Sequence, residues 1–210
     1  MKNEHANQLR QSGYTDGQNG KNRKWHFQGG GTDNVQLSYA GVKKRYQDGK
    51  DSVHRYNGEE INVASYTDEY LKFLRLLDKH KVDYLVIGAY AVMIHTKTPR
   101  ATKDMDTWIR QTEENAVKLA ASLKEFGGLE VSEEAILKMG QRIEIKSEAF
   151  KIEIWTSQEI LGFEEAWERK LTDTLEDFSI NVVSKEDLIK LKKHFNRPQD
   201  KMDLSLLENG

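Results

Sequence analysis

The sequence predicts an α+β domain, in which helices flank a mixed sheet and a helical motif ends the chain. Three observations lead to this class. A short apolar run from Val82 to Ile87 ends at Gly88 and leads into a helical pattern, which is typical of a buried strand followed by a helix. Ile143 to Ile145 and Ile152 to Ile154 alternate apolar and charged residues, as a β-hairpin does. Capping residues begin several amphipathic helical patterns.

The first elements follow one another from Thr67. This residue is predicted to cap a helix that runs to about His80, because acids fill its first turn and apolar residues follow at helical spacing. After the strand that ends at Gly88, a second helix is predicted from Ala89 to His95. A second strand is then expected to reach Ile109.

The remaining elements are predicted from caps and periodicity. One further strand is expected from Phe178 to Val183. The predicted helices begin at Thr112, Ser132, Thr156 or Ser157, Ser184 and Pro198, and the first, third and last of them end near Gly127, Trp167 and Leu207.

Composition excludes several classes of function. The 210 residues include no cysteine, so disulfides, thiolate metal sites and cysteine nucleophiles are excluded. The 32 basic and 34 acidic residues give a net charge of -2, which offers no overall attraction for nucleic acid or anionic lipid. Because no apolar run approaches the roughly 20 residues that cross a bilayer, we expect a soluble, cytoplasmic protein without membrane partners.

Two regions differ in composition. Residues 1–60 are rich in Gly, Asn, Gln and Asp and contain few aliphatic side chains, so they are predicted to form a flexible leader or a small helical unit. Residues 61–210 are predicted to form the folded domain.

The chemistry is predicted to lie at Gly88 and at a pair of aspartates. A glycine between a strand and a helix lets a phosphate approach the unpaired N–H groups of Gly88 and Ala89 at the positive end of the helix. Asp104 and Asp106 are two residues apart on a predicted strand, so their side chains share one face at a spacing of about 6 to 7 Å. Such a pair suits a hard divalent cation. The alternative is a pair of solvated acids on a half-exposed strand.

Glu153 is the candidate for a third acid, since it faces away from the isoleucines beside it. With a turn at 148–149, Glu144 lies opposite Glu153. Opposed like charges destabilise a hairpin, so a bound cation or the neighbouring Lys146 and Lys151 must offset them. The alternative is a charged hairpin that faces solvent.

Several ordered blocks together resemble the minimal nucleotidyltransferases, and more closely their AbiEii-type toxin branch. The blocks lie within residues 67–207 and are Val82 to Val92, Pro99 to Asp106, Ile152 to Thr156, Gly162 to Trp167, Ser184 to Lys192 and Arg197 to Asp203.

The resemblance implies a polymerase β-like nucleotidyltransferase fold and a set of site residues. Asp104, Asp106 and Glu153 are implied to be the catalytic acids that bind Mg²⁺, and Gly88 and Ala89 to contact the triphosphate. The resemblance also implies that nucleotide-binding residues are Arg100, Lys192, Arg197 and Asp200.

The function implied is Mg²⁺-dependent transfer of a nucleoside monophosphate from a nucleoside triphosphate to a hydroxyl. Acceptors suggested by the resemblance are an RNA or tRNA end, a protein or a small molecule, in a toxin–antitoxin or phage-defence context with a cognate antitoxin. The alternative is a catalytically degenerate nucleotide-binding regulatory protein of the same fold. Ala89 and Glu153 stand where the family usually has Gly or Ser and Asp, which keeps that alternative open.

Overall fold

The computed structural model describes residues 68–100, 102, 104–146 and 150–209, together with the strand residues 34–38, 54–56 and 59–61. The strands are β1 (Asn34–Ser38), β2 (His54–Tyr56), β3 (Glu59–Ile61), β4 (Tyr84–Val86), β5 (Asp104–Ile109), β6 (Arg142–Lys146), β7 (Lys151–Trp155), β8 (Leu171–Leu175) and β9 (Phe178–Val182). The helices are α2 (Asp68–Lys79), α3 (Gly88–Thr96), α4 (Glu113–Gly127), α5 (Glu133–Leu137), α6 (Phe163–Glu168), α7 (Lys185–Phe195) and α8 (Pro198–Asn209).

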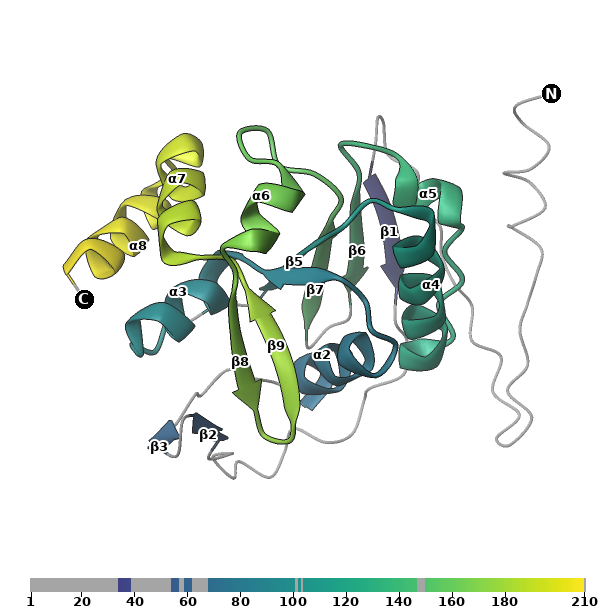
Figure 1. Ribbon diagram of the computed structural model, residues 1–210, viewed down its shortest axis with the longest axis horizontal. Coiled ribbons are helices and arrows are strands. Elements are labelled where there is room, and N and C mark those ends of the chain that lie inside the picture. Colours follow the sequence, from purple (N-terminus) through teal and green to yellow (C-terminus); the bar gives the residue numbers. More distant parts are fainter. Residues whose placement is uncertain are drawn as a thin grey trace.

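Within the described residues, one mixed sheet has the strand order β1-β6-β7-β5-β4-β9-β8, and β2 and β3 pair separately (Figure 1). Three of its neighbouring pairs are parallel, namely β1 with β6, β5 with β7 and β4 with β9. The other three are antiparallel. Helices accompany the sheet, so the predicted α+β class is confirmed.

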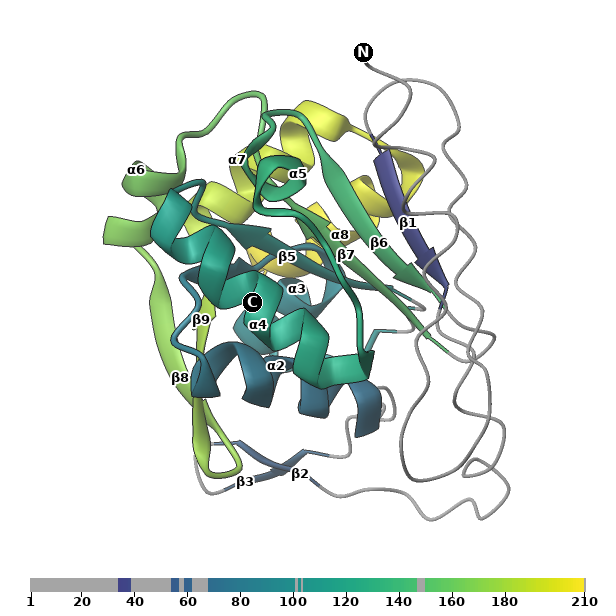
Figure 2. The same ribbon diagram turned by 90° about the vertical axis from the view of Figure 1, so that its right-hand side faces the viewer.

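The helices divide between the two sides of the central strands. In both ribbon views α4 lies on one side of β5 and β7, and the pair α7–α8 lies on the other (Figure 1, Figure 2). Helix α2 packs beside α4, whereas α3 contacts both α7 and α8. The arrangement leaves the first residues of β5 and β7 facing the C-terminal helices, and the candidate site lies there.

Aromatic side chains fill much of the core between sheet and helices. Tyr70, Phe73 and Trp108 are almost completely buried. Tyr70 meets Tyr90 edge to face at a centroid distance of 5.6 Å, which ties α2 to α3.

Several predicted elements are confirmed. Thr112 caps α4 by accepting a hydrogen bond from the backbone N–H of Asn115, and Gly128 ends that helix with a positive φ of 70°. Ser132 and Ser184 cap α5 and α7 in the same way. In the hairpin of β6 and β7, Glu144 is the register partner of Glu153, as predicted.

Two predictions were wrong or incomplete. The helix expected from Thr156 starts only at Phe163, because the Thr156 hydroxyl instead donates to the carbonyl of Gln141 and accepts from its N–H, closing the end of the hairpin. Strand β8 was missed, since its sequence Leu-Thr-Asp-Thr-Leu is mostly polar and exposed. It is an edge strand that pairs only with β9 among the described residues.

The predicted leader, residues 1–60, lies outside the described residues except for β1, β2 and the first part of β3. Its flexibility or helical character, and the boundary at residue 61, therefore stay predictions. The proposed cap at position 67 also lies outside the described residues. Among the described helices, none is both long and apolar enough to pass through a bilayer.

Candidate active site

A cavity of about 300 Å³ lies between the sheet and the C-terminal helices. One wall comes from β5 and the β6–β7 hairpin, and the other comes from α7 and the residues that follow it. Its lining consists of Ile87, Gly88, Asp104, Asp106, Arg142, Lys151, Glu153, Trp155, Gln158, Leu188, Leu191, Lys192, Phe195 and Arg197.

Gly88 brings the start of α3 against the side chain of Asp106. Its φ is +66°, a conformation that L side chains rarely adopt. A Cβ built at this position would lie 2.2 Å from Asp106 Oδ2 and 3.0 Å from Asp106 Cβ. The backbone N–H of Ile87 also donates to the Asp106 carbonyl over 3.0 Å. Glycine is therefore the residue that the contact with Asp106 requires, and the first N–H groups of α3 begin at the cavity.

The acids are brought together by strand register. Asp104 and Asp106 occupy alternate positions of β5, whereas Met105 between them is fully buried. In the parallel ladder Asp106 is the partner of Glu153, and in the antiparallel hairpin Glu153 is the partner of Glu144. Three strands thus place these carboxylates in neighbouring positions, with Asp104, Asp106 and Glu153 in the cavity lining.

Two cations offset this negative charge. The ammonium Nζ of Lys151 lies 2.7 Å from Glu153 Oε1 and 2.9 Å from Asp104 Oδ2. Arg142 Nη1 lies 3.2 Å from the same Glu153 oxygen. Lys151 was one of the two lysines predicted to offset the opposed glutamates. Lys146, the other, makes no ion pair with the site carboxylates within the described part of the chain.

Burial and the neighbouring charge of Glu153 raise the pKa of Asp106 to about 6. The indole N–H of Trp155 donates to Asp106 Oδ1 over 3.4 Å and acts in the opposite direction, and it does not cancel the two larger effects. Ionisation of the Asp106 carboxyl is therefore disfavoured by burial and by the nearby Glu153. Burial also lowers the pKa of Lys151, but the hydrogen bonds to Glu153 and Asp104 outweigh it and raise that pKa.

The shift at Asp106 predicts a pH dependence of stability. A carboxyl whose pKa is higher in the folded protein than its ordinary 3.8 binds more protons when folded, so the free energy of unfolding falls as pH rises from about 4 to about 6. Asp106→Asn removes the titrating carboxyl, so its free energy of unfolding lacks this decrease. We expect the variant to gain stability relative to the parent across that interval, measured by urea unfolding in EDTA. A stability difference that stays constant from pH 4 to 7 would contradict the prediction.

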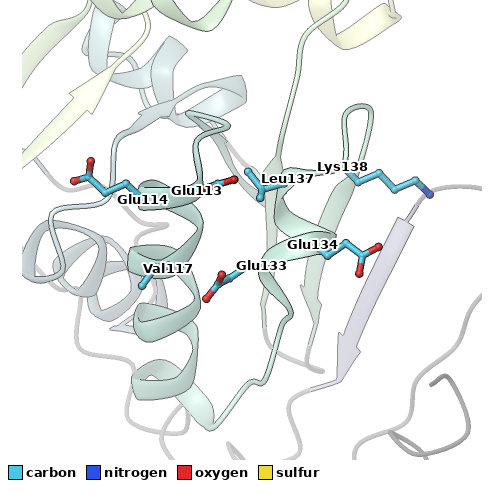
Figure 3. Close-up of a pocket in the computed structure, with 7 residues that line it drawn as sticks. All are labelled: Glu113, Glu114, Val117, Glu133, Glu134, Leu137 and Lys138. Atoms are coloured by element: carbon cyan, nitrogen blue, oxygen red, sulfur yellow. The ribbon is translucent and has the colours of Figure 1, made fainter.

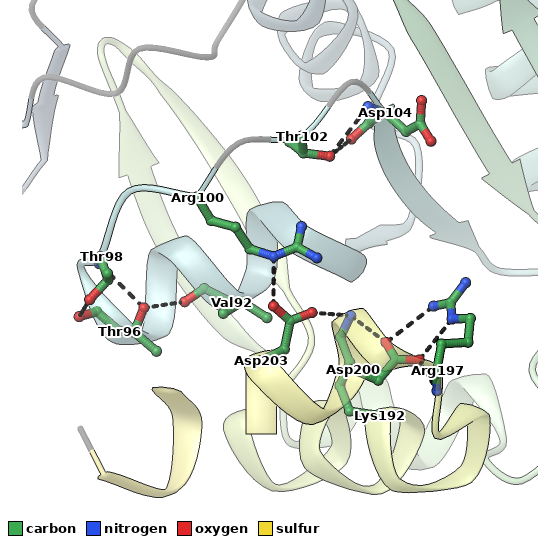
Figure 4. A network of polar contacts seen from close by, with 10 residues as sticks. All are labelled: Val92, Thr96, Thr98, Arg100, Thr102, Asp104, Lys192, Arg197, Asp200 and Asp203. Atoms are coloured by element: carbon green, nitrogen blue, oxygen red, sulfur yellow. Dashed lines mark hydrogen bonds and ion pairs between the residues drawn. The ribbon is translucent and has the colours of Figure 1, made fainter. Parts of the chain in front are cut away.

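The opposite wall of the cavity contains buried ion pairs between α7, α8 and the segment after α3 (Figure 4). Lys192 Nζ lies 3.0 Å from Asp200 Oδ1 and 2.7 Å from Asp203 Oδ2, and both carboxylates are fully buried. Arg197 Nε is 2.7 Å from Asp200 Oδ2, and Arg100 Nε is 2.6 Å from Asp203 Oδ1. Burial raises the pKa of Asp200, but the hydrogen bonds from Arg197 and Lys192 outweigh it and lower that pKa to about 2.

The structure brings most of the predicted site residues into one cavity. Its lining includes the predicted residues Gly88, Asp104, Asp106, Glu153, Lys192 and Arg197. Asp200 is not part of the lining, but it accepts hydrogen bonds from Lys192 and Arg197, which are, and so holds them in position. Arg100 is directed toward Asp203 on α8, and Ala89 is buried in α3, so neither lines the cavity as described.

Three residues of the site were missed by the sequence reasoning, namely Asp203, Arg142 and Phe195. Asp203 is three residues after Asp200 on α8 and therefore on the same helical face, a spacing that could have identified it. Arg142 lies near the acids because of the register of the β6–β7 hairpin, in which it is two residues before Glu144. Phe195 lines the cavity and is 41% exposed, which is unusual for a phenylalanine.

A second, more open cavity of about 700 Å³ lies between α4 and α5 (Figure 3). Glutamates from the first turns of both helices surround it, with Val117, Leu137 and Lys138. Acids in the first turn stabilise the helix dipole, which accounts for their position without a ligand.

The three acids of the first cavity have the donor chemistry that a hard divalent cation requires. Carboxylate oxygens are the preferred ligands of Mg²⁺, and a protonated amine already lies between Asp104 and Glu153. As arranged in the described residues, no group of three or more acidic or histidine side chains forms a ready metal site. The residue types therefore fit a cation, whereas in this arrangement Lys151 takes the bonds of two of the carboxylates.

Comparison with known proteins identifies relatives of the chain. The model of a family described as "Nucleotidyltransferase of unknown function (DUF6036)" matches residues 67–207. No curated protein matches the chain.

Three solved structures are similar to the chain. The lincosamide antibiotic adenylyltransferase LnuA, bound to lincomycin, is 22% identical with a TM-score of 0.50, over 68% of this chain and 96% of that one. A Thermotoga maritima protein assigned as a nucleotidyltransferase is 18% identical with a TM-score of 0.45, over 67% and 93% of the two chains. ANT(2″)-Ia, in complex with adenylyl-2″-tobramycin, is 13% identical with a TM-score of 0.43, over 65% and 84%. At 22% identity the likeness to LnuA shows a common fold.

Proposed function

Because the chain belongs to the DUF6036 family of nucleotidyltransferases, we propose that it transfers a nucleoside monophosphate from a nucleoside triphosphate to an acceptor hydroxyl. The observation that supports this most strongly is the division of charge across the cavity. All three acids, Asp104, Asp106 and Glu153, line the sheet side, with Arg142 and Lys151 beside them, whereas the charged residues of the helical side are the cations Lys192 and Arg197. A polyphosphate accompanied by a divalent cation carries both signs of charge and is complementary to such a pair of walls.

Asp104, Asp106 and Glu153 are the residues that would hold Mg²⁺. When bound, the cation supplies Lewis-acid stabilisation of phosphate oxygens and lowers the pKa of a hydroxyl.

The protein's own groups account for binding and orientation of the triphosphate. Gly88 allows a phosphate to come close to the first N–H groups of α3, where the helix dipole favours negative charge. Lys192 and Arg197 supply positive charge for the phosphate oxygens, and fixed charges of this kind stabilise the charge that develops in phosphoryl transfer. Asp200 and Asp203 hold the Lys192 ammonium in one position, so little reorganisation is needed when a phosphate arrives.

The acceptor is proposed to be a hydroxyl of a small molecule, a tRNA end or a protein. LnuA is a lincosamide adenylyltransferase that shares this fold, which supports a small molecule. The resemblance to AbiEii-type toxins expected from the sequence supports tRNA or protein and a toxin–antitoxin or phage-defence context. The absence of cysteine is compatible with the cytoplasmic location that we also propose. These acceptor classes are compared in one experiment.

A regulatory protein that binds nucleotide without turnover is the second candidate. The ion pairs of Lys151 and Arg142 with the site carboxylates favour it, since bonds already made to these acids compete with a cation. Nucleotide binding without transfer to any acceptor would distinguish this candidate from the enzyme.

The test is label transfer. The protein is incubated with Mg²⁺, each α-labelled nucleoside triphosphate and, separately, total tRNA, cell extract or a lincosamide. We expect transfer by the parent chain and a loss of at least about 100-fold in Asp104→Ala/Asp106→Ala, because electrostatic stabilisation of the transition state is removed. Glu113→Ala/Glu114→Ala, which removes two acids at the second cavity, is the matched control and should retain activity. Equal label transfer by the parent and the Asp104/Asp106 variant would refute the assignment.

A further inference from the structure

Lys151 occupies the gap between carboxylates of two strands. It begins β7 and is the register partner of Asp104 on β5, and Glu153 follows it by two residues on the same face. Its ammonium reaches Asp104 Oδ2 at 2.9 Å and Glu153 Oε1 at 2.7 Å. A single positive charge therefore bridges two of the three acids that line the cavity.

The backbone of Lys151 is held by the sheet and by α2, whereas its side chain is partly exposed and is held through its ion pairs. Its peptide N–H donates to the hydroxyl of Tyr70 on α2 over 3.3 Å, and its strand pairs on both sides. The side chain is partly exposed at 26% and has a flexible four-carbon stem. The ammonium can thus leave the carboxylates without any movement of the sheet.

Arg142 contacts an aromatic ring as well as the same glutamate. It contacts the Glu153 oxygen at 3.2 Å, and its guanidinium lies over the ring of Trp155 at 5.3 Å from the centroid. Because Arg142 stays with Glu153, removal of Lys151 leaves that buried glutamate with one cationic partner. Lys151 is consequently the cation whose departure opens the position between Asp104 and Glu153.

We propose that Lys151 is an exchangeable counter-ion, which holds Asp104 and Glu153 together until a divalent cation takes its place. This inference rests on the proposed function, since it assigns a cation to the same acids. The released ammonium remains in a cavity that is lined by Lys192 and Arg197 on the other side, where a nucleotide phosphate is its new partner.

The exchange couples two ligands. A divalent cation alone must displace Lys151 from two carboxylates, which weakens its binding. A nucleoside triphosphate offers the displaced ammonium a phosphate, so nucleotide and cation each strengthen the binding of the other.

The experiment measures Mn²⁺ affinity by calorimetry, first without nucleotide and then with a non-hydrolysable nucleoside triphosphate analogue. We expect Lys151→Met to bind Mn²⁺ roughly tenfold more tightly than the parent in the absence of nucleotide, because hydrogen bonds to charged groups no longer compete. The gain in Mn²⁺ affinity that the analogue produces should shrink by a similar factor. Lys151→Arg keeps the competing charge and should bind Mn²⁺ within about twofold of the parent.

Lys146→Met is the matched control. Lys146 is the exposed cross-strand partner of Lys151. Its substitution therefore removes the same charge from the neighbouring strand, outside the cavity lining. Its Mn²⁺ affinity should equal that of the parent. The rise in unfolding temperature on addition of Mn²⁺ gives a second readout, and Lys151→Gln replaces Lys151→Met if the latter does not fold.

The outcomes separate this inference from the function on which it rests. Mn²⁺ affinity that is unchanged or weaker in folded Lys151→Met, or in Lys151→Gln where that variant replaces it, overturns the counter-ion role, even where the parent transfers label. Equal tightening in Lys151→Met and Lys146→Met reduces the effect to general charge and also overturns it. Absence of Mn²⁺ binding in parent and variants alike, with analogue present, overturns both the counter-ion role and the cation assignment.

Discussion

Lys192→Met is expected to destabilise the protein by about 3–5 kcal/mol, because it leaves buried carboxylates without their shared cation. Lys192 is itself buried, and the side chains of Asp200 and Asp203, 3.0 and 2.7 Å from its ammonium, are fully buried. Arg197 and Arg100 each keep one carboxylate partner, and neither replaces the charge between the two. The free energy of unfolding is measured by urea denaturation at pH 7.

Lys193→Met is the control for this variant. Lys193 is the next residue on α7 and forms an ion pair with Glu208 in which both side chains are about half exposed. Its removal should change stability by no more than about 0.5 kcal/mol. Adding Asp203→Asn to Lys192→Met should restore part of the loss, since one uncompensated charge disappears. A loss below about 1 kcal/mol in Lys192→Met would contradict the importance of these ion pairs.

Gly88→Ala is expected to cost about 3 kcal/mol and to reduce nucleotidyl transfer by at least about 100-fold. Two effects add to the loss in the free energy of unfolding. An alanine at a φ of +66° is strained, and its Cβ would overlap the carboxylate of Asp106, with Asp106 Cβ only 3.0 Å away. Because Asp106 Cβ is itself close, rotation of the carboxylate alone does not relieve the contact. The displaced carboxylate is one of the proposed metal ligands, so activity falls as well.

Gly128→Ala separates strain from overlap. Gly128 has a φ of +70°, almost the same as Gly88, but nothing lies within 4 Å of the position that its Cβ would take. This variant should cost only the strain of about 1–2 kcal/mol. In an Asp106→Ala background, which removes the carboxylate but keeps Cβ, the cost of Gly88→Ala should fall toward that value without reaching it. Equal destabilisation by Gly88→Ala and Gly128→Ala in the parent would show that the overlap has no energetic effect.

Local patterns predicted the parts of the site that depend on local structure. The strand–glycine–helix turn at Gly88 is a single continuous stretch, and the pairing of Glu144 with Glu153 depends only on the turn of one hairpin. The family likeness and the similarity to LnuA extend this to the nucleotidyltransferase fold as a whole.

Contacts between distant segments were not predictable in the same way. The parallel pairing of β5 with β7 decides that Asp106 neighbours Glu153, and no periodicity within either strand encodes that choice. The pairing of Arg100 with Asp203 requires α3 and α8 to pack together. Strand β8 has too few apolar residues to be recognised, because only its last residue is buried.

The ladder between β5 and β7 makes the cavity depend on complete folding of the domain. Helices α4 and α5 and strand β6 intervene in the chain, so Asp106 meets Glu153 only after a long loop has closed. Lys192 lies on α7, and Arg197 lies in the short link between α7 and α8. A molecule in which these helices open locally keeps the turn at Gly88 but loses one whole wall of the cavity. A ligand held between both walls therefore stabilises sheet and C-terminal helices as one cooperative unit and suppresses partial unfolding.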